Sequence, residues 1–400
     1  MIKISYIFYK AKDLKISDFL AAGKMIAAIA VSPAFKKKYK NTWIVCEDEK
    51  EARDNGYWFF KHVTQNHPEQ KCVYAIKPKA VDYPKVSALG ETVQYGSFRH
   101  WIIYLTSQFN ISSQKGGKPN AALCAFMELN HLFKRQNVFL QHGVTINKAR
   151  WLYADRSSFK YFITATTPET EYIEKYFGYE KGVVRNTGFS RFDNLHNLEV
   201  KKNRILIMPS WRVWFKEKSA QVDSSDANFE SSEYLEKWKG LLSDEKMKAL
   251  IEKYQLEIIF YPHRNMQDYL HCFSDVDSGV IIGSSREYDV QDLLKTSRLL
   301  ITDYSSVFFD MIYMKKPIIF YQFDEEKFRQ QQYQEGYFDY HNNAFGRSYK
   351  TSEPLLEELT GYVQNNFEVS KEYLEEHQKV FQHYDANNSE RIYRLLKEEQ

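Results

Sequence analysis

Cysteine is scarce in this chain and follows no metal-binding or redox pattern. The four cysteines, Cys46, Cys72, Cys124 and Cys272, form no CxxC pair, which argues against zinc or a disulfide scaffold and fits a reducing cytoplasm. The GxxxxGKS/T phosphate loop, the GxSxG elbow and the HExxH motif are also missing, as is any repeat at solenoid spacing. ATPase, esterase and zinc-protease functions are therefore disfavoured.

Positive charge is confined to one end of the chain. Residues 1–40 hold nine lysines and two aspartates, a net charge of +7, so the remaining residues carry −4 of the total of +3. A broadly basic face for nucleic acid is thereby excluded, and we expect no nucleic-acid partner.

A long hydrophobic run is missing as well. Residues 19–31 are apolar but are interrupted by Lys24 and stopped near Pro33, and no small-residue cleavage site follows a basic start. The run is too short for a membrane span and does not resemble a secretory signal. Two interpretations stay open: a helix in the membrane interface with the lysines of residues 36–40 over anionic lipid, or a core helix with a solvated basic end.

What the chain does have is a regular alternation of short apolar runs and amphipathic stretches, with 43% hydrophobic residues. Strands are predicted at 43–46, 72–76, 137–140, 161–164, 204–208, 256–261, 280–282, 299–302 and 317–321, and helices at 49–63, 82–89 and 99–105. This pattern is typical of α/β proteins with parallel sheets. Two such series predict two Rossmann-like lobes with a cleft between them.

The domain boundary is predicted in the polar segment 195–203. We expect a basic amphipathic segment at 1–40, an acceptor lobe at 41–198, a nucleotide-binding lobe at 199–370 and a helical tail at 371–400. Residues 216–233, rich in Lys, Ser, Asp and Glu, are predicted to form a loop, either a flap over the cleft or a disordered insertion.

The most informative segment is Leu299–Asp310. An apolar strand ends in Thr302-Asp303-Tyr304, and a helix is predicted to start on Ser305 and Ser306. Free backbone N–H groups and two hydroxyls at a helix start suit a phosphate, although Ser and Asp cap helices without any ligand.

Two further strand ends carry histidines. Residues 137–140 lead into Gln141-His142-Gly143, and residues 256–261 lead into Pro262-His263-Arg264. The carboxyl ends of parallel strands form the ligand crevice of open α/β sheets. A lone histidine there is usually a solvated or capping residue, but two of them beside a predicted phosphate site indicate chemistry.

With these motifs side by side, the chain resembles the CDP-glycerol glycerophosphotransferases of teichoic acid and capsule synthesis. The resemblance covers most of residues 130–345, and residues 51–57 look like the amino-terminal lobe of capsule-type members. It rests on Gln141-His142-Gly143, Thr187–Asp193, Met208–Arg212, Pro262-His263 and Asp289–Leu294, followed by the most specific motif, Thr302–Asp310. Gln141, Val144-Thr145 and Ser190 depart from the usual family residues and leave the acceptor and the polyol open.

The resemblance implies the GT-B fold and transfer of a polyol phosphate, most simply glycerol phosphate, from a CDP-polyol to a hydroxyl of a lipid-linked glycan or growing polymer, with release of CMP. The enzyme would work in the cytoplasm at the inner face of the membrane. The implied donor is CDP-glycerol or CDP-ribitol. A nucleotide-sugar GT-B glycosyltransferase and a non-catalytic membrane-associated scaffold are the alternatives.

The implied reaction assigns tasks to eleven residues. His142 takes the acceptor proton, while His263 and Arg212 face the diphosphate, although the two histidines can exchange their tasks. The donor would be bound by Arg212, Thr302, Asp303, Ser305, Ser306 and Asp310, with Asp310 or Asp303 on the ribose, and Gln141, Gly143 and Arg191 would lie on the acceptor side. No cofactor is indicated: the DxD string Asp275-Val276-Asp277 precedes a strand instead of following one, so Mg²⁺ stays open without support from this pattern.

Overall fold

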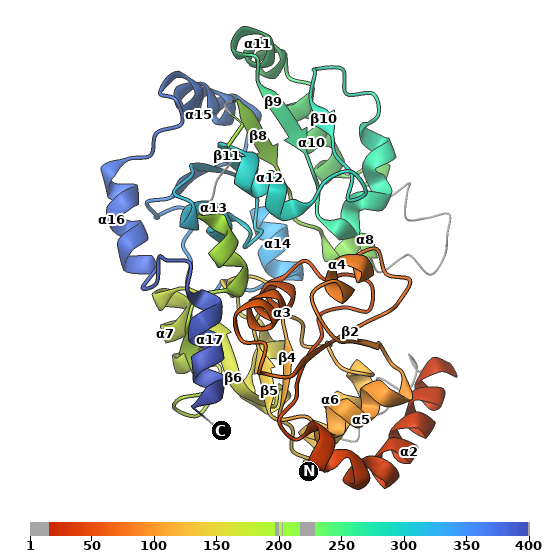
Figure 1. Cartoon of the computed structure of the whole chain (residues 1–400). Helices are drawn as coiled ribbons and strands as arrows, with labels where there is room; N and C mark the ends of the chain where they lie inside the picture. Colours follow the sequence, from red (N-terminus) through yellow and green to blue (C-terminus); the bar gives the residue numbers. More distant parts are fainter. Residues whose placement is uncertain (1–15, 197–199, 202, 217–228, 399–400) are drawn as a thin grey trace. The chain divides into compact units, whose positions relative to one another are not determined.

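The computed structural model describes residues 16–196, 200–201, 203–216 and 229–398 (Figure 1). The chain divides into two units. The first comprises residues 1–142, 150–194 and 385–400, and the second comprises residues 143–149 and 195–384. Most of the predicted loop 216–233 and part of the predicted boundary lie outside the described residues, as do residues 1–15 of the basic segment.

The first unit is built on a seven-stranded sheet in the order β3-β2-β1-β4-β5-β6-β7. Its strands are β1 (Trp43–Val45), β2 (Cys72–Ile76), β3 (Thr92–Gln94), β4 (Phe109–Ser112), β5 (Asn137–Phe139), β6 (Phe159–Thr164) and β7 (Val184–Asn186). Every pairing is parallel. The order reverses between β1 and β4, which is the switch point where doubly wound sheets bind their ligands.

Helices connect these strands. They are α3 (Asn55–Asn66), α4 (Tyr83–Ser87), α5 (Phe98–Thr106), α6 (Ala121–Leu129) and α7 (Thr167–Tyr176), with short 3₁₀ helices η1 (Arg150–Leu152), η2 (Ala154–Arg156) and η3 (Ser190–Leu195). Helix α17 (Asn388–Lys397) comes from the other end of the chain and packs against α3 (Figure 1). The predicted tail of residues 371–400 is therefore not one segment, because its last part belongs to the first unit.

Helix α2 (Ile16–Tyr39) continues through Pro33, where the sequence predicts a stop. Proline has no N–H to donate to the carbonyl of Ile29, and the Ser32 hydroxyl bonds that carbonyl instead at 3.1 Å. The prediction that this segment is too short for a bilayer is wrong: residues 18–39 are long and apolar enough to cross one, by length and composition only.

One side of α2 packs on α5 through Met25, Ala28 and Tyr39, whereas most of the helix is exposed, including Phe19 and Ile26. The interpretation as a core helix is therefore supported for one face of α2 only.

The second unit contains a six-stranded parallel sheet in the order β10-β9-β8-β11-β12-β13. Its strands are β8 (Arg204–Ile207), β9 (Glu257–Phe260), β10 (Ile281–Ile282), β11 (Leu299–Thr302), β12 (Ile318–Tyr321) and β13 (Gly346–Tyr349). Here the order reverses between β8 and β11. The motifs at 208–212 and 302–310 follow these two strands, so they start at the same switch point.

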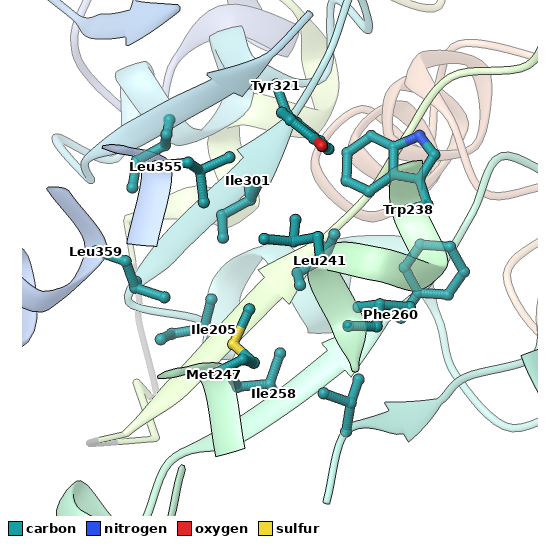
Figure 2. Close-up of a cluster of buried hydrophobic side chains, with 14 of the residues drawn as sticks. Ile205, Trp238, Leu241, Met247, Ile258, Phe260, Ile301, Tyr321, Leu355 and Leu359 are labelled. Carbon is teal, nitrogen blue, oxygen red and sulfur yellow. The ribbon is translucent and has the colours of Figure 1, made fainter. Parts of the chain in front are cut away.

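Alternate residues of these strands build the core of the second unit (Figure 2). Ile205, Ile258 and Ile301 lie on one face of the sheet and pack against Trp238 and Leu241 of α10 (Glu233–Leu242). Burial on both faces explains why these strands read as continuous apolar runs. The remaining helices are α8 (Val213–Lys216), α11 (Glu245–Tyr254), η4 (Arg264–Phe273), α12 (Val290–Thr296), α13 (Phe308–Tyr313), α14 (Glu325–Gln331), α15 (Ser352–Gln364) and α16 (Lys371–Val380).

Candidate active site

The loop after β5 carries His142, and its backbone is held in an uncommon conformation. Gln141 has a φ of 58°, in the left-handed region that non-glycine residues seldom adopt. Its side chain is buried, and Nε2 donates to the carbonyl of Ile163 at 2.7 Å and to Glu169 Oε1 at 3.0 Å. Gln141 therefore positions the loop from within the protein and does not face an acceptor as the sequence predicts.

Asn55 joins this loop to the segment that carries Arg191. Its Nδ2 donates to the carbonyls of Leu140 at 3.2 Å and Gln141 at 2.7 Å, and its Oδ1 accepts from the Arg191 N–H at 3.1 Å. The side chain is fully buried, so each of these bonds replaces one that water would otherwise supply. Asn55 thus fixes the backbone that leads into the candidate base, His142, and the backbone of Arg191.

The start of α3, where Asn55 stands, is held by a buried carboxylate. Glu47, which follows β1, accepts from the backbone N–H groups of Arg53 at 3.0 Å and Tyr57 at 2.7 Å, and from the Ser113 hydroxyl at 3.0 Å. A side chain at Gly56 would meet Glu47 Cγ at 2.8 Å, so only glycine permits this approach. Burial raises the pKa of Glu47 despite these hydrogen bonds.

The His142 imidazole is exposed to solvent and is at the same time crowded by protein atoms. Desolvation lowers its pKa, and the nearby Arg191 guanidinium lowers it further, whereas a hydrogen bond with the Ser113 backbone raises it. Because that hydrogen bond favours the charged imidazole, the backbone group must be a carbonyl acceptor. At neutral pH, His142 is therefore an uncharged imidazole with one N–H held by Ser113 and the other nitrogen able to accept a proton.

Arg191 is buried in the same unit. Its guanidinium lies over the rings of Phe189 and Phe192, and Nη1 is 3.3 Å from Asp54 Oδ1. The structure thus brings Gln141, His142 and Arg191 together around Asn55.

In the second unit, Arg212 is fully buried between two carboxylates. Nη1 is 2.8 Å from Asp303 Oδ2, while Nε and Nη2 bind Asp324 at 2.7 and 3.0 Å. Burial disfavours the charged guanidinium, but Asp303 and Asp324 outweigh it and raise the pKa of Arg212. The hypothesis that Arg212 faces a diphosphate finds no support in this geometry, because its exposure is 0% and its charge is neutralised within the protein.

Asp303 and Thr302 are also internal. Asp303 Oδ1 accepts from the Ser210 N–H at 2.8 Å, the Ser210 hydroxyl at 2.7 Å and the Tyr304 N–H at 2.6 Å, and the Thr302 hydroxyl donates to the Met208 carbonyl at 2.7 Å. Both residues are fully buried. They join the ends of β8 and β11. Contacts with a ligand are therefore left to the residues that follow Asp303 in the chain.

Ser305 and Ser306 are partly exposed and form the turn after Tyr304. Helix α13 begins only at Phe308, so the two hydroxyls precede the helix and do not start it as predicted. Gly143 packs closely on this turn: a Cβ there would lie 2.6 Å from Ser306 Oγ. Asp310 lies in the first turn of α13 and is buried.

His263 follows β9 and precedes η4. Its Nδ1 accepts from the Asn265 backbone N–H at 3.2 Å, and the backbone N–H of His263 donates to the Pro209 carbonyl at 3.0 Å. This second bond ties the end of β9 to the motif after β8. The side chain is partly exposed and its ring lies 6.4 Å from that of Trp211.

Comparison with protein families gives a match over residues 27–398 to CDP-glycerol:poly(glycerophosphate) glycerophosphotransferases. The chain belongs to this family. Among curated relatives, the minor teichoic acid biosynthesis protein GgaB of Bacillus subtilis is 30% identical over 90% of the chain and 40% of its own length. A teichoic acid glycerol-phosphate transferase of Staphylococcus aureus is 25% identical over 63% of the chain and 62% of its own length. The chain thus spans about 40–60% of the length of these relatives.

Solved structures place this chain in a known fold. The wall teichoic acid polymerase TagF superposes with a TM-score of 0.67 at 17% identity, over 96% of the chain and 98% of TagF. A UDP-N-acetylglucosamine 2-epimerase from Listeria monocytogenes gives 0.54 at 12% identity, over 90% of the chain and 96% of the epimerase. The predicted α/β class with two parallel sheets, and the GT-B type, are confirmed.

Sequence reasoning about this family member found the two histidines but missed the residues that hold them. Asn55 and Glu47 lie far along the chain from His142, and Asp324 lies far from Arg212. The one available signal was the segment 51–57, noted for its family resemblance and not for a task. The two carboxylates of the Asp275-Val276-Asp277 string are exposed, and Asp275 pairs with Lys239 at 2.6 Å.

Proposed function

We propose that the chain transfers a polyol phosphate, most simply glycerol phosphate, from a CDP-polyol to an acceptor hydroxyl and releases CMP. The observation that carries the proposal is the family match over residues 27–398, with histidines at the ends of β5 and β9 in the motifs of that family. Relatives are named as transferring or polymerising glycerol phosphate, and others as polymerising ribitol phosphate. The proposed acceptor is a lipid-linked glycan or growing polymer in teichoic acid or capsule synthesis.

In this proposal His142 acts as the base. An acceptor hydroxyl gives its proton to the imidazole nitrogen that Ser113 does not hold, and its oxygen attacks the phosphorus that bears the polyol. The bond from phosphorus to the oxygen of CMP breaks, and CMP leaves with that oxygen. Because His142 is neutral near pH 7, it is ready to accept the proton.

The donor side is assigned to His263, Ser305 and Ser306. These residues are partly exposed and lie at the carboxyl ends of strands in the second unit, as an anionic ligand requires. Phosphoryl transfer depends mainly on alignment and charge stabilisation. Buried contacts of Arg212, Asp303 and Thr302 support the backbone near these residues. Gly143 permits close packing against Ser306. Asp310 is retained as the ribose ligand of this proposal.

The function is tested with purified chain, a defined lipid-linked acceptor, and CDP-glycerol, CDP-ribitol and a panel of nucleotide sugars as donors. We expect CMP release matched by a gain of polyol-phosphate mass in the product, with CDP-glycerol as the better donor. Sugar incorporation with loss of a nucleoside diphosphate would replace the proposal with a glycosyltransferase. If no donor is consumed while the chain still binds vesicles, the scaffold alternative holds.

We also propose that α2 docks the chain on the inner face of the cell membrane. Exposed apolar side chains, including Phe19, Leu20 and Ile26, line a helix whose last turn carries Lys36, Lys37 and Lys38. Apolar groups can enter the interface while the lysines contact anionic headgroups, each contributing about 1 kcal/mol.

Replacing Lys36, Lys37 and Lys38 by glutamine should therefore weaken co-sedimentation with phosphatidylglycerol vesicles by roughly 100-fold. The matched control changes Lys181, Lys253 and Lys371, which are exposed outside α2, and should bind as the parent chain does. Equal binding of both triple variants contradicts the docking. Resistance of the bound chain to alkaline extraction shows instead that the helix crosses the bilayer.

A further inference from the structure

Two histidines and a glutamate meet at the contact between α3 and α17, within the first unit. His62 lies in the last turns of α3, His67 caps its end, and Glu390 comes from the first turn of α17. His62 Nε2 is 3.0 Å and His67 Nε2 is 2.7 Å from Glu390 Oε2, so both imidazoles contact the same carboxylate oxygen. Each side chain is about one-fifth exposed, which leaves a path from solvent.

Three ligand-type atoms converge here in a way that suits a metal ion. The two imidazole nitrogens and the carboxylate oxygen all lie within 4.8 Å of one another. Around a tetrahedral Zn²⁺, with bonds of about 2.0–2.2 Å, neighbouring ligand atoms are about 3.3 Å apart. The two nitrogen–oxygen separations, 3.0 and 2.7 Å, widen to that value through changes of a few tenths of an ångström.

The groups around the cluster resemble the outer shell of metal sites. His67 Nδ1 lies 3.7 Å from Glu69 Oε1, and the Tyr393 hydroxyl donates to the same Glu69 oxygen at 3.1 Å. Metal-bound histidines usually give their second N–H to such a carboxylate. The Tyr393 ring also stacks on His67 at 3.5 Å, which fixes the imidazole plane.

His62 has a comparable neighbour. Its Nδ1 lies 3.2 Å from the side-chain amide nitrogen of Asn66. When this amide group is rotated by a half-turn, its oxygen takes that place and can accept a proton from Nδ1. Arg394 binds the other oxygen of Glu390 at 2.8 Å and leaves Oε2 to the histidines.

We propose that His62, His67 and Glu390 form a zinc site that joins α17 to α3. Zn²⁺ would replace the two contacts of the imidazoles with Glu390 Oε2, and each imidazole would bind through Nε2 as a neutral ligand that carries its one proton on Nδ1. Water would occupy the fourth position. The cysteine pattern predicts no zinc, but this site uses no cysteine. The site would link two segments more than 320 residues apart in sequence.

The test measures Zn²⁺ binding by calorimetry to the full chain after chelator treatment, with metal content determined on the purified protein. We expect one saturable site and a higher Tm with Zn²⁺ than without. H67Q and E390Q should each weaken the affinity by at least about 100-fold, and E69Q by roughly 10–100-fold. The matched controls H271Q and C272S remove ligands from the second, more exposed Glu230, His271 and Cys272 group, and should retain the site.

Unchanged affinity in H67Q and E390Q, or no saturable binding by the parent chain, overturns the proposal and leaves a hydrogen-bonded contact between the helices. Circular dichroism distinguishes loss of ligand from loss of fold. If H67Q and E390Q fail to fold, E69Q decides, because Glu69 contributes none of the three proposed ligand atoms. Polyol-phosphate transfer by the chelator-treated chain is measured separately. A negative result for zinc binding therefore does not bear on the proposed function.

Discussion

Replacing His142 by glutamine should lower kcat for polyol-phosphate transfer by about 10²–10⁴-fold. The substitution removes the only group of this exposed side chain that can take up a proton, while Gln141 and Asn55 still hold the loop through buried hydrogen bonds. KM for the CDP-polyol should change little, because the residues assigned to the donor lie in the second unit. Steady-state kinetics with a defined acceptor measures both quantities.

The pH dependence of kcat/KM provides a second test of the role of His142. Desolvation and Arg191 lower its pKa below the ordinary value of about 6.5, so the imidazole stays neutral and able to accept a proton as the pH falls through that value. The acid limb of kcat/KM should therefore lie below pH 6.5, and H142Q should abolish that limb. H271Q, at an exposed histidine elsewhere, is the control and should keep rate and profile. An unchanged rate in H142Q, with a folded chain, would assign the proton transfer to another group.

The strands with continuous apolar runs could be predicted from the sequence almost to the residue. β2 and β11 occupy the predicted ranges, since their side chains are buried on both faces of a parallel sheet. Strands β3, β4, β7 and β13 were not predicted. β4 and β13 read Phe-Asn-Ile-Ser and Gly-Arg-Ser-Tyr, patterns that only pairing with neighbouring strands turns into sheet. Local propensity gives no signal for such pairing.

The start of α3 shows the same limit for the site. A helix is predicted from Glu49, but it begins at Asn55 because Glu47 binds the N–H groups of Arg53 and Tyr57 and Asp54 caps the first turn. No spacing in the sequence indicates that a carboxylate after β1 meets this segment. The same contact aligns Asn55 with the His142 loop. The position of the base after a strand can thus be recognised in the sequence, whereas the residues that hold the base in place depend on tertiary contacts.

Arg212→Ala should lower the free energy of unfolding by about 3–5 kcal/mol. The substitution leaves Asp303 and Asp324 in a fully buried site without the guanidinium that now neutralises them. It also removes the contacts of Arg212 with the rings of Tyr304 and Phe328. Urea unfolding followed by tryptophan fluorescence measures the loss, and Arg286→Ala, at an exposed position, should stay within about 0.5 kcal/mol of the parent chain.

The triple variant Arg212→Met, Asp303→Asn, Asp324→Asn decides between the two tasks considered for this arginine. If Arg212 serves to neutralise buried carboxylates, removing all three charges should cost less stability than removing the arginine alone, because no unpaired charge is left inside. A ligand-facing arginine predicts a different result: Arg212→Ala would unfold at nearly the parent urea concentration and would raise KM for the CDP-polyol. The burial of Arg212 and its two carboxylate partners favour the first outcome.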